Sequence, residues 1–286
     1  MKNTVKVLFK DIYLYPTINS YKKLFSIKSF IRKELKSASL LSLPRFGGFM
    51  LKIPEHLAII PDGNRRLAKR LLRKPWKGHE WGVEKIRDIL EWCKELGTRI
   101  VTVYLLSLEN FDRRPKRELN FLFDLARKEI RSIMTDEKHI VHKNRVRVRF
   151  FGRLDLLPED LREDIRKVSE RTKNYSDYFL NLALAYGGRQ EIVDAARRMA
   201  QDARKGVLSP PKIDEDVMRS YFWTNGFPDP DLIIRTGGER RLSNFLPFQS
   251  TYSELVFLDK FWPELEKKDF FGAVKEFGER ERRFGK

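Results

Sequence analysis

The sequence predicts an α/β fold in which a mainly parallel, six-stranded sheet is flanked by helices. From Pro54 onward, six short apolar runs alternate with longer stretches whose apolar residues recur at helical spacing, a rhythm typical of consecutive βαβ units. Charged and glycine-rich motifs follow several of these runs directly. Ligands of such sheets bind beyond the carboxyl ends of the strands, so we expect these motifs to meet at one edge.

The expected strands are short runs bounded by charged or turn-forming residues. His56–Ile60 and Leu232–Arg235 are apolar almost throughout, as strands buried on both faces are. Basic and apolar residues alternate along Arg145–Phe151, which predicts one buried and one exposed face. The other strands are expected at Ile100–Leu106, Phe179–Tyr186 and Glu254–Leu258.

Helices are expected at residues 80–96, 116–138, 158–173, 189–205, 213–223 and about 268–283. The stretch from Glu118 is the clearest, because its apolar residues form one stripe at spacings of three and four. Such a stripe usually packs in a core, whereas a nearby phosphate site would favour the wall of an apolar tunnel. The stripe consists of Leu119, Leu122, Phe123, Ala126, Ile130 and Ile133.

Residues 1–50 are expected to form an extension separate from the main domain at 51–286. They hold eight of the eighteen net positive charges of the chain. Apolar residues within 20–36 recur at helical spacing, which predicts an amphipathic helix with a basic face. Such a helix either docks on the domain or lies on a membrane surface. Leu43-Pro44 and Gly47-Gly48 are typical of a linker.

The composition limits the partners and the compartment. A net charge of +18 indicates phosphorylated molecules, anionic lipid or nucleic acid, but no nucleic-acid-binding module is recognisable, so nucleic acid is not expected. Cys93 is the only cysteine, which excludes an intrachain disulfide and indicates a reducing compartment. Without a signal peptide or an apolar run of about 20 residues, a cytoplasmic chain is expected, soluble or peripheral on the inner face of the membrane.

The histidines do not predict a metal site. The spacing of His56, His79, His139 and His142 is not that of metal ligands, and a single cysteine cannot build a zinc site. His139 and His142 fall in a charged stretch and are expected to be solvated.

An anion site is expected where the strand at 232–235 ends. The segment Arg-Thr-Gly-Gly-Glu-Arg from Arg235 contains two glycines, whose missing Cβ atoms would open their backbone N–H groups to an oxyanion. Arg235 and Arg241 supply forked donors suited to bidentate phosphate contact. A diphosphate is the expected ligand.

A carboxylate follows the first strand, in the segment Pro61–Arg66. Asp62 alone would repel a diphosphate, so it suits such a site only if a divalent cation bridges the two. Mg²⁺ commonly joins one or two carboxylates to substrate phosphates and is therefore the expected cofactor. The commoner role of an Asp-Gly pair is an N-cap or a turn, which is the alternative.

The second strand is followed by a hydroxyl, an amide and two arginines within Leu106–Pro115. Ser107 and Asn110 are candidates for orienting a substrate or relaying a proton. A neutral amide is a poor base, so the proton would need a further acceptor. A capped turn is the structural alternative for the same residues.

Taken together and in this order, the motifs resemble those of the cis-prenyltransferases, the undecaprenyl- and dehydrodolichyl-diphosphate synthases. The resemblance spans nearly all of residues 54–286, and its details lean toward archaeal members. An Asp-Asp pair, typical of the unrelated trans-type synthases, is absent. The matching blocks are 56–66, 78–79, 107–115, 185–189, 231–245, Glu254 and 280–285.

The resemblance implies that the chain adds isopentenyl diphosphate units to an allylic diphosphate, farnesyl or geranylgeranyl diphosphate, and makes a long-chain polyprenyl diphosphate for lipid-linked glycan carriers. Diphosphate leaves the allylic carbon as the second substrate attacks, and proton loss leaves a cis double bond. Mg²⁺, a homodimer and an apolar tunnel are also implied, which favours the tunnel interpretation of the 118–133 stripe.

Residue by residue, the resemblance makes Asp62 and Asn110 catalytic, with Ser107 tied to proton removal. It assigns the metal to Asp62 and Glu254. The further substrate-binding positions in these first blocks are Gly63, Asn64, Arg65, Arg66, Leu67, His79, Leu108, Glu109, Phe111 and Arg113.

Isopentenyl diphosphate is assigned by the same resemblance to Arg235, Arg241 and Ser243, with Leu242 beside them. Arg283 and Gly285 match a terminal element that contributes to phosphate binding across a dimer interface.

Three positions depart from the family pattern. Leu67 and Leu106 stand where aromatic residues are usual, and Pro75 stands where a phosphate-binding arginine is usual. Arg73 or Lys74 would substitute for that arginine if the loop shifts.

Two alternatives keep the fold but change the function. One is a non-catalytic partner subunit, against which the presence of Asp62, Asn110, Arg235 and Arg241 argues. The other is a family member that transfers the prenyl group to another acceptor or with another regiochemistry.

Overall fold

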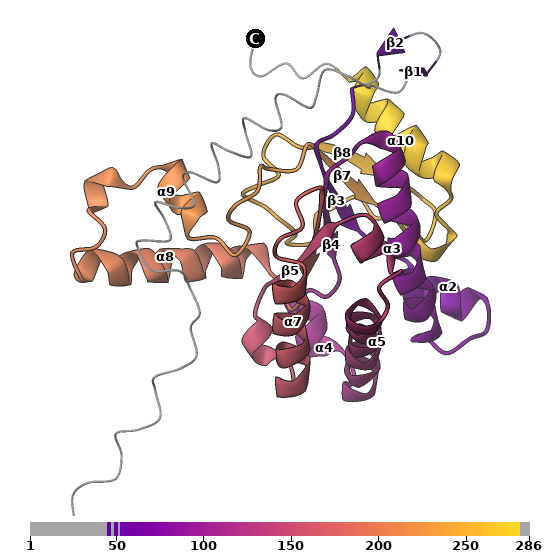
Figure 1. Ribbon diagram of the computed structural model, residues 1–286, viewed down its shortest axis with the longest axis horizontal. Coiled ribbons are helices and arrows are strands. Elements are labelled where there is room, and N and C mark those ends of the chain that lie inside the picture. The colour runs from indigo at the N-terminus through magenta and orange to yellow at the C-terminus, as the bar shows by residue number, and fades with distance from the viewer. Residues whose placement is uncertain (1–44, 47–48, 51, 281–286) are drawn as a thin grey trace, which may run out of the picture. The chain divides into compact units, whose positions relative to one another are not determined.

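The computed structural model describes residues 45–46, 49–50 and 52–280 of the 286-residue chain. It confirms the α/β fold, since six strands form one parallel sheet in the order β5-β6-β4-β3-β7-β8 (Figure 1). The strands are β3 (His56–Ile60), β4 (Ile100–Tyr104), β5 (Val146–Phe151), β6 (Tyr178–Ala183), β7 (Leu232–Arg235) and β8 (Glu254–Phe257).

The expected helices are present, with ends that differ by a few residues. They are α3 (Lys77–Leu96), α5 (Lys116–Thr135), α7 (Glu159–Arg171), α8 (Gly188–Arg204), α9 (Glu215–Ser220) and α10 (Lys267–Glu279). Three shorter helices were not expected, because four to seven residues are too few to show a repeat: α2 (Asn64–Arg70), α4 (Leu108–Arg113) and α6 (Ile140–Lys143). No helix in the described part of the chain is long and apolar enough to cross a bilayer.

Contacts divide the chain into two units, Met1–Leu43 and Pro44–Lys286. The amphipathic helix expected within 20–36 lies outside the described residues. Where the sequence indicated a linker, β1 (Arg45–Phe46) and β2 (Phe49–Met50) form a short antiparallel pair. Aromatic residues favour strands, and this pattern was hidden by the glycine pair between them.

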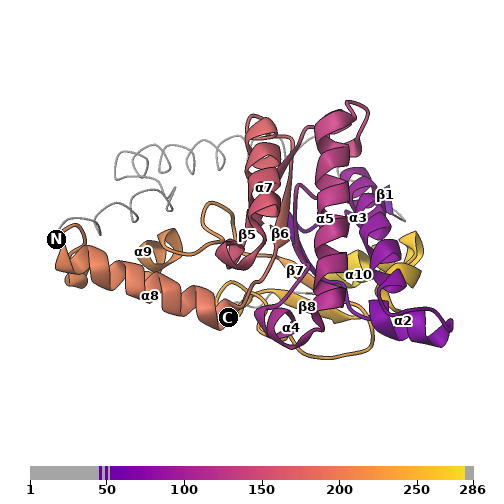
Figure 2. The ribbon, with the colours of Figure 1, turned by 90° about the horizontal axis from the view of Figure 1, so that it is seen from below.

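Alternate residues of each strand enter two different cores. Leu57 and Ile59 of β3 face the larger core, which α3, α5, α7 and α10 cover. Ala58 and Ile60 face a smaller core completed by aromatic residues such as Tyr186 and Phe245. Figure 2 shows α8 and α9 side by side, to one side of these helices.

The apolar stripe of α5 packs in the larger core. Leu119, Phe123, Ile130 and Ile133 are buried there, while Leu122 and Ala126 pack against the same core at its margin. The core interpretation of the stripe is therefore confirmed, and the tunnel interpretation stays a prediction.

Strands β4 and β6 end earlier than expected. The N–H groups of Leu105 and Leu106 both donate to the carbonyl oxygen of Ala183, so the regular ladder stops after Tyr104. Strand β5 begins at Val146, one residue later than expected, because Arg145 has a φ of 49° in the left-handed region.

The expectation that His139 and His142 are solvated is wrong. His139 is buried, its Nε2 lies 3.2 Å from Oε1 of Glu129, and its Nδ1 accepts a hydrogen bond from the N–H of Val141. His142 is half-buried, with Nε2 2.6 Å from the carbonyl oxygen of Ile133. The short helix α6 turns this charged segment back against α5, which composition alone does not reveal.

His56 should make the free energy of unfolding depend on pH. It is buried, with Nδ1 2.7 Å from the carbonyl oxygen of Pro228 and Nε2 2.7 Å from the hydroxyl of Thr102. Burial lowers the pKa of His56 from 6.5 to about 4. Between pH 6.5 and pH 4 His56 is therefore protonated in the unfolded chain but not in the folded one. The contribution of neutral His56 to the free energy of unfolding is fully present above pH 6.5 and is lost as the pH falls towards 4.

Below about pH 4 this loss amounts to about 3 kcal/mol. Urea denaturation between pH 7 and pH 4 should show the wild type losing that much more stability than the non-titrating variant His56→Asn. Parallel pH profiles for the two proteins would contradict this prediction.

Candidate active site

The carboxyl edge of the sheet brings together the motifs that follow three strands. β3 lies between β4 and β7, and Ile60 of β3 stands opposite Arg235 of β7. Asp62 follows β3 by two residues and Ser107 follows β4 by three. The predicted meeting of the motifs at one edge is confirmed.

Asp62 is the centre of this edge. Its Oδ2 accepts a hydrogen bond from Nη2 of Arg235 at 2.9 Å, and its Oδ1 lies 3.1 Å from Nη2 of Arg66. Burial would raise the pKa of Asp62, but Arg235 and Arg66 outweigh burial and hold it below its usual value. The main chain is fixed too, because the hydroxyl of Thr236 accepts from the N–H of Asp62 and donates to its carbonyl oxygen.

Arg235 is held as a rigid fork beneath the same edge. It is buried, and its Nη1 donates to Oγ of Ser243 at 2.7 Å and to the carbonyl oxygen of Arg241. Its Nε is buried without a hydrogen-bond partner. The side chain of Arg241 is exposed and pairs with Glu239. Arg235 is thus joined to Ser243 and to the main chain of Arg241, and the predicted binding of isopentenyl diphosphate by these residues stays a prediction.

The expected role of the two glycines in this motif is wrong. The N–H of Gly237 donates to the carbonyl oxygen of Lys260 at 2.7 Å, and that of Gly238 donates to Leu258 at 2.9 Å. Neither N–H is open to an anion. The glycines instead adopt φ values of 88° and 77°, and a Cβ on Gly237 would lie 2.7 Å from Nη2 of Arg66. Gly237 therefore lets Arg66 and Asp62 approach the strand end.

A second cluster, two arginines and a histidine, surrounds Glu118, a buried carboxylate at the start of α5. Its Oε1 lies 3.2 Å from Nε2 of His79, 3.6 Å from Nε of Arg65 and 3.6 Å from Nε of Arg114. The hydrogen bond from His79 lowers the pKa of Glu118, and both arginines lower it further. Burial lowers the pKa of His79. At neutral pH His79 is therefore an uncharged donor beside an ionised carboxylate.

The sequence motifs indicated Arg113 rather than Arg114, and they gave Glu118 no role in the site. Arg113 is exposed, whereas the side chain of Arg114 is 14% exposed and its Nε and Nη1 are buried without hydrogen-bond partners. Two buried, unsatisfied N–H donors are costly unless a ligand accepts from them. The spacing of four between Arg114 and Glu118 across a helix start was the available signal.

Ser107 and Asn110 form a capped turn. Oγ of Ser107 accepts a hydrogen bond from the backbone N–H of Asn110 at 3.0 Å and caps α4, which confirms the structural alternative. Beside Ser107, the hydroxyl of Tyr104 lies 3.3 Å from the carbonyl oxygen of Ser243. Burial raises the pKa of Tyr104 far above its usual value, so it stays a hydroxyl. Tyr104, which the sequence did not indicate, connects the end of β4 to the Arg235 fork.

The remaining predicted residues differ in their surroundings. Gly63 has a φ of 103° and lies against the ring of Phe261. Asn64 donates to the carbonyl oxygen of Pro61, and its Oδ1 is buried against α3. Glu109 accepts from Nδ2 of Asn244 at 2.8 Å. Buried or half-buried apolar side chains make up the rest, Leu67, Leu108, Phe111 and Leu242.

Glu254 is not brought to Asp62 within one chain. It is the first residue of β8 and stands opposite Leu232, the first residue of β7, so it lies at the amino edge of the sheet. There its carboxylate pairs with Nη1 of Arg280 at 2.9 Å. Arg283 and Gly285 lie outside the described residues.

A Mg²⁺ ion fits the donors at Asp62 if it arrives with a diphosphate. Within residues 52–280 no three His, Cys, Asp or Glu side chains gather as a complete metal site. The side chain of Asp62 is 31% exposed. A second carboxylate, that of Glu239, is near: both Asp62 and Glu239 pair with Arg66, and Oε1 of Glu239 lies 3.5 Å from Nη1 of Arg66. Mg²⁺ accepts one or two carboxylates and completes its coordination with phosphate oxygens and water. When bound, it would neutralise charge on the leaving phosphate.

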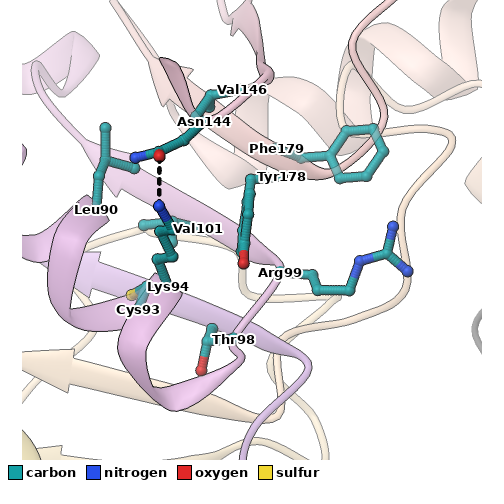
Figure 3. A pocket seen from close by; sticks show the side chains of 10 residues that line it. All are labelled: Leu90, Cys93, Lys94, Thr98, Arg99, Val101, Asn144, Val146, Tyr178 and Phe179. Atoms are coloured by element: carbon teal, nitrogen blue, oxygen red, sulfur yellow. Dashed lines mark hydrogen bonds between the residues drawn. The ribbon is translucent and has the colours of Figure 1, made fainter. Parts of the chain in front are cut away.

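A hollow at the other edge of the sheet is not part of this site. Figure 3 shows it between the end of α3 and the amino ends of β4, β5 and β6, where Lys94 donates to Asn144 at 2.7 Å. The groups around Asp62 and Glu118 lie at the opposite, carboxyl edge of the sheet, after β3, β4 and β7.

Comparison with known proteins identifies the family. A family model described as "Putative undecaprenyl diphosphate synthase" matches residues 60–285. The chain belongs to this family, the cis-prenyltransferases. A tritrans,polycis-undecaprenyl-diphosphate synthase (geranylgeranyl-diphosphate specific) from Methanopyrus kandleri is 52% identical over 235 residues, 82% of this chain and 86% of its own. A synthase of the same name from Thermococcus kodakarensis is 47% identical over 280 residues, 98% of this chain and 96% of its own.

Solved structures agree with this cis-prenyltransferase assignment. Lavandulyl diphosphate synthase from Lavandula x intermedia, in complex with dimethylallyl diphosphate, gives a TM-score of 0.77 at 34% identity and covers 82% of this chain and 99% of its own. A probable undecaprenyl diphosphate synthase from Campylobacter jejuni gives 0.67 at 34% identity, with 82% and 100% covered. The chain is thus a prenyl-transferring enzyme, as the motifs predicted.

Glu118 should be a positioning residue of this cis-prenyltransferase. Replacing it by alanine leaves buried Arg114 and His79 without their carboxylate, so the free energy of unfolding should fall by about 3 kcal/mol. Glu118→Gln should lose less, because its amide oxygen still accepts from His79. Denaturant titration measures both variants.

Asp124→Ala, on an exposed position of the same helix, is the control and should stay within about 0.5 kcal/mol of the wild type. In turnover assays Glu118→Gln should raise KM for the allylic diphosphate more than KM for isopentenyl diphosphate. Equal changes in both KM values would show that Glu118 only stabilises the fold.

Proposed function

We propose that this cis-prenyltransferase adds isopentenyl diphosphate units to an allylic diphosphate and makes a long-chain polyprenyl diphosphate, the lipid of glycan carriers. The observation that supports this proposal is a pair of cationic clusters on the two sides of Asp62. One is the fork of Arg235 with Ser243, and the other surrounds Glu118. Two clusters suit two diphosphate groups, because each phosphate needs its own donors.

Geranylgeranyl diphosphate is the proposed primer, with farnesyl diphosphate as the second choice. The relatives from Methanopyrus kandleri and Thermococcus kodakarensis are both named as geranylgeranyl-diphosphate specific. The proposal also includes a homodimer and contact with the cytoplasmic face of a membrane.

In the proposed reaction the bond between the allylic carbon and its diphosphate breaks, and the diphosphate takes the electron pair. The terminal carbon (C4) of isopentenyl diphosphate forms the new carbon–carbon bond and positive charge develops on C3. Loss of a proton from C2 then leaves the new double bond between C2 and C3. Arg65, Arg66, His79 and Arg114 would hold the departing diphosphate, whose growing charge they stabilise. Arg241 would close on the isopentenyl diphosphate that the Arg235 fork holds.

Ser107 and Asn110 are proposed to guide the proton away from the new bond. Ser107 follows β4 and caps α4, on which Asn110 lies, and Tyr104 joins Ser107 to the Ser243 main chain. A hydroxyl passes a proton on only if an acceptor stands next to it, and phosphate oxygens would supply that acceptor here.

Mass spectrometry of the products tests this proposal. The purified chain is given Mg²⁺, isopentenyl diphosphate and, in separate reactions, geranyl, farnesyl or geranylgeranyl diphosphate. We expect a ladder of products that differ by one C5 unit and that is strongest with geranylgeranyl diphosphate. Product that appears only after a second protein is added would favour the partner-subunit alternative.

A different regiochemistry is the second candidate, because a solved relative is a lavandulyl diphosphate synthase. Leu67 and Leu106, which stand where aromatic residues are usual, are both buried near the strand ends. A single product containing one added prenyl unit and no ladder would favour this candidate.

A further inference from the structure

The turn between α2 and α3 lies at the edge of the part of the chain that the structure describes (Figures 1 and 2). It contains two exposed leucines, Leu71 and Leu72. Leu72 is 94% exposed, more than any other large hydrophobic side chain in the described part of the chain, and Leu71 is 50% exposed. An exposed pair of adjacent leucines contributes nothing to the core. Such a pair is favourable only when another apolar surface covers it.

The backbone of this turn makes the leucine at position 72 more unusual. The N–H of Leu72 donates to the carbonyl oxygen of Lys69, and the N–H of Arg73 donates to that of Ala68. These two bonds are those of a Schellman motif, whose left-handed position is normally glycine. Here Leu72 holds that position with a φ of 53°. A leucine at position 72 is therefore unfavourable for two reasons, the strained backbone and the exposed apolar side chain.

The charges around the leucines all have one sign. From Arg65 to His79 the chain has seven Lys or Arg residues and no acidic residue. Some are paired with distant carboxylates, such as Arg70 with Glu264. Among residues 52–280, no carboxylate lies within ion-pair distance of Lys69, Arg73 or Lys74, and Lys74 lies over the ring of Trp76.

We propose that the turn 69–76 docks on an anionic lipid surface, with Leu71 and Leu72 inserted among the acyl chains and the cations on the headgroups. Lys or Arg near such a surface strengthens binding by about fivefold each. A tryptophan beside the cations suits the interface between water and lipid. Nucleic acid would match the charge but offers no apolar surface for the leucines. The docking rests on the membrane contact of the proposed function and gives it a place on the chain, but its test needs no substrate and so is separate from the test of catalysis.

A dye on residue 72 tests the docking independently of any binding by residues 1–50. The full chain carries Leu72→Cys labelled with a polarity-sensitive fluorophore. Cys93 does not compete for the label, because it is 1% exposed and burial raises the pKa of its thiol. Leu156→Cys, another exposed leucine, is the matched control. Vesicles contain phosphatidylglycerol and phosphatidylcholine, with or without bromine on the acyl chains.

We expect the dye at 72 to shift to the blue on anionic vesicles and to be quenched by the brominated chains, whereas the dye at 156 stays unquenched. Phosphatidylcholine alone should give neither effect. Bound protein whose dye at 72 remains in water, or no binding at all, would overturn the proposal. So would a shift caused by concentrated protein or by RNA without vesicles, because a second copy or a nucleic acid would then cover the turn.

Leu72→Gly separates binding from folding. Glycine relieves the left-handed strain, so the melting temperature should rise by about 2–4 °C. Loss of the inserted side chain should weaken partition into anionic vesicles by about tenfold. Unchanged partition in Leu72→Gly and in Leu71→Ser would contradict the insertion, while Leu156→Ser should have no effect in either measurement.

Discussion

Replacement of Asp62 by asparagine is expected to lower kcat by about a thousandfold with the fold intact. Asparagine keeps the shape of Asp62 and can still accept a hydrogen bond from Arg235, so the strand ends stay together. It removes the negative charge that Arg235 and Arg66 stabilise and that a Mg²⁺ ion shared with the diphosphate would need. Steady-state kinetics and far-ultraviolet circular dichroism measure the two parts of this prediction.

Asp112→Asn is the matched control, because Asp112 is an exposed aspartate on α4. It should keep nearly normal kcat. If Asp62→Asn were as active as this control, Asp62 would have only the structural role of a turn residue.

Replacement of Arg235 by lysine is expected to raise KM for isopentenyl diphosphate about a hundredfold. Arg235 donates to Asp62, to Ser243 and to the carbonyl oxygen of Arg241 at once, and a lysine cannot reproduce this planar fork. The diphosphate that depends on the same fork would lose its positioned donors. Initial rates with each substrate varied in turn separate the two KM values.

Arg240→Lys provides the control in the same motif, since Arg240 is exposed. It should change neither KM by more than about twofold. If Arg235→Lys raised KM for the allylic diphosphate and left KM for isopentenyl diphosphate unchanged, the Arg235 cluster would bind the allylic substrate instead, contrary to the assignment.

Most of the fold followed from local patterns. The six strands were predictable because each is a short apolar run bounded by turns, and their parallel order followed from the helices between them. The meeting of Asp62 with Arg235 was predictable too, because both follow strands that end at the same edge. Glu254 begins its strand, so the same reasoning puts it at the opposite edge, and its role as a metal ligand stays a prediction.

The rest of the site depended on contacts that no local pattern encodes. Glu118 meets His79 because α5 packs beside α3, 39 residues apart in the chain. The N–H groups of Gly237 and Gly238 are occupied because the segment after β8 returns to them. Arg113 and Arg114 are adjacent and chemically identical in sequence, and only the turn into α5 decides which one is buried.

In the proposed reaction the two cationic clusters of this one chain bind two diphosphate substrates, which are then joined. Diphosphate release from the purified wild-type chain, measured with Mg²⁺ and each substrate alone or combined, tests it most directly. We predict release of one diphosphate for each isopentenyl diphosphate consumed, and only when geranylgeranyl or farnesyl diphosphate is also present. No release with both substrates present, or equal release without isopentenyl diphosphate, would contradict the account.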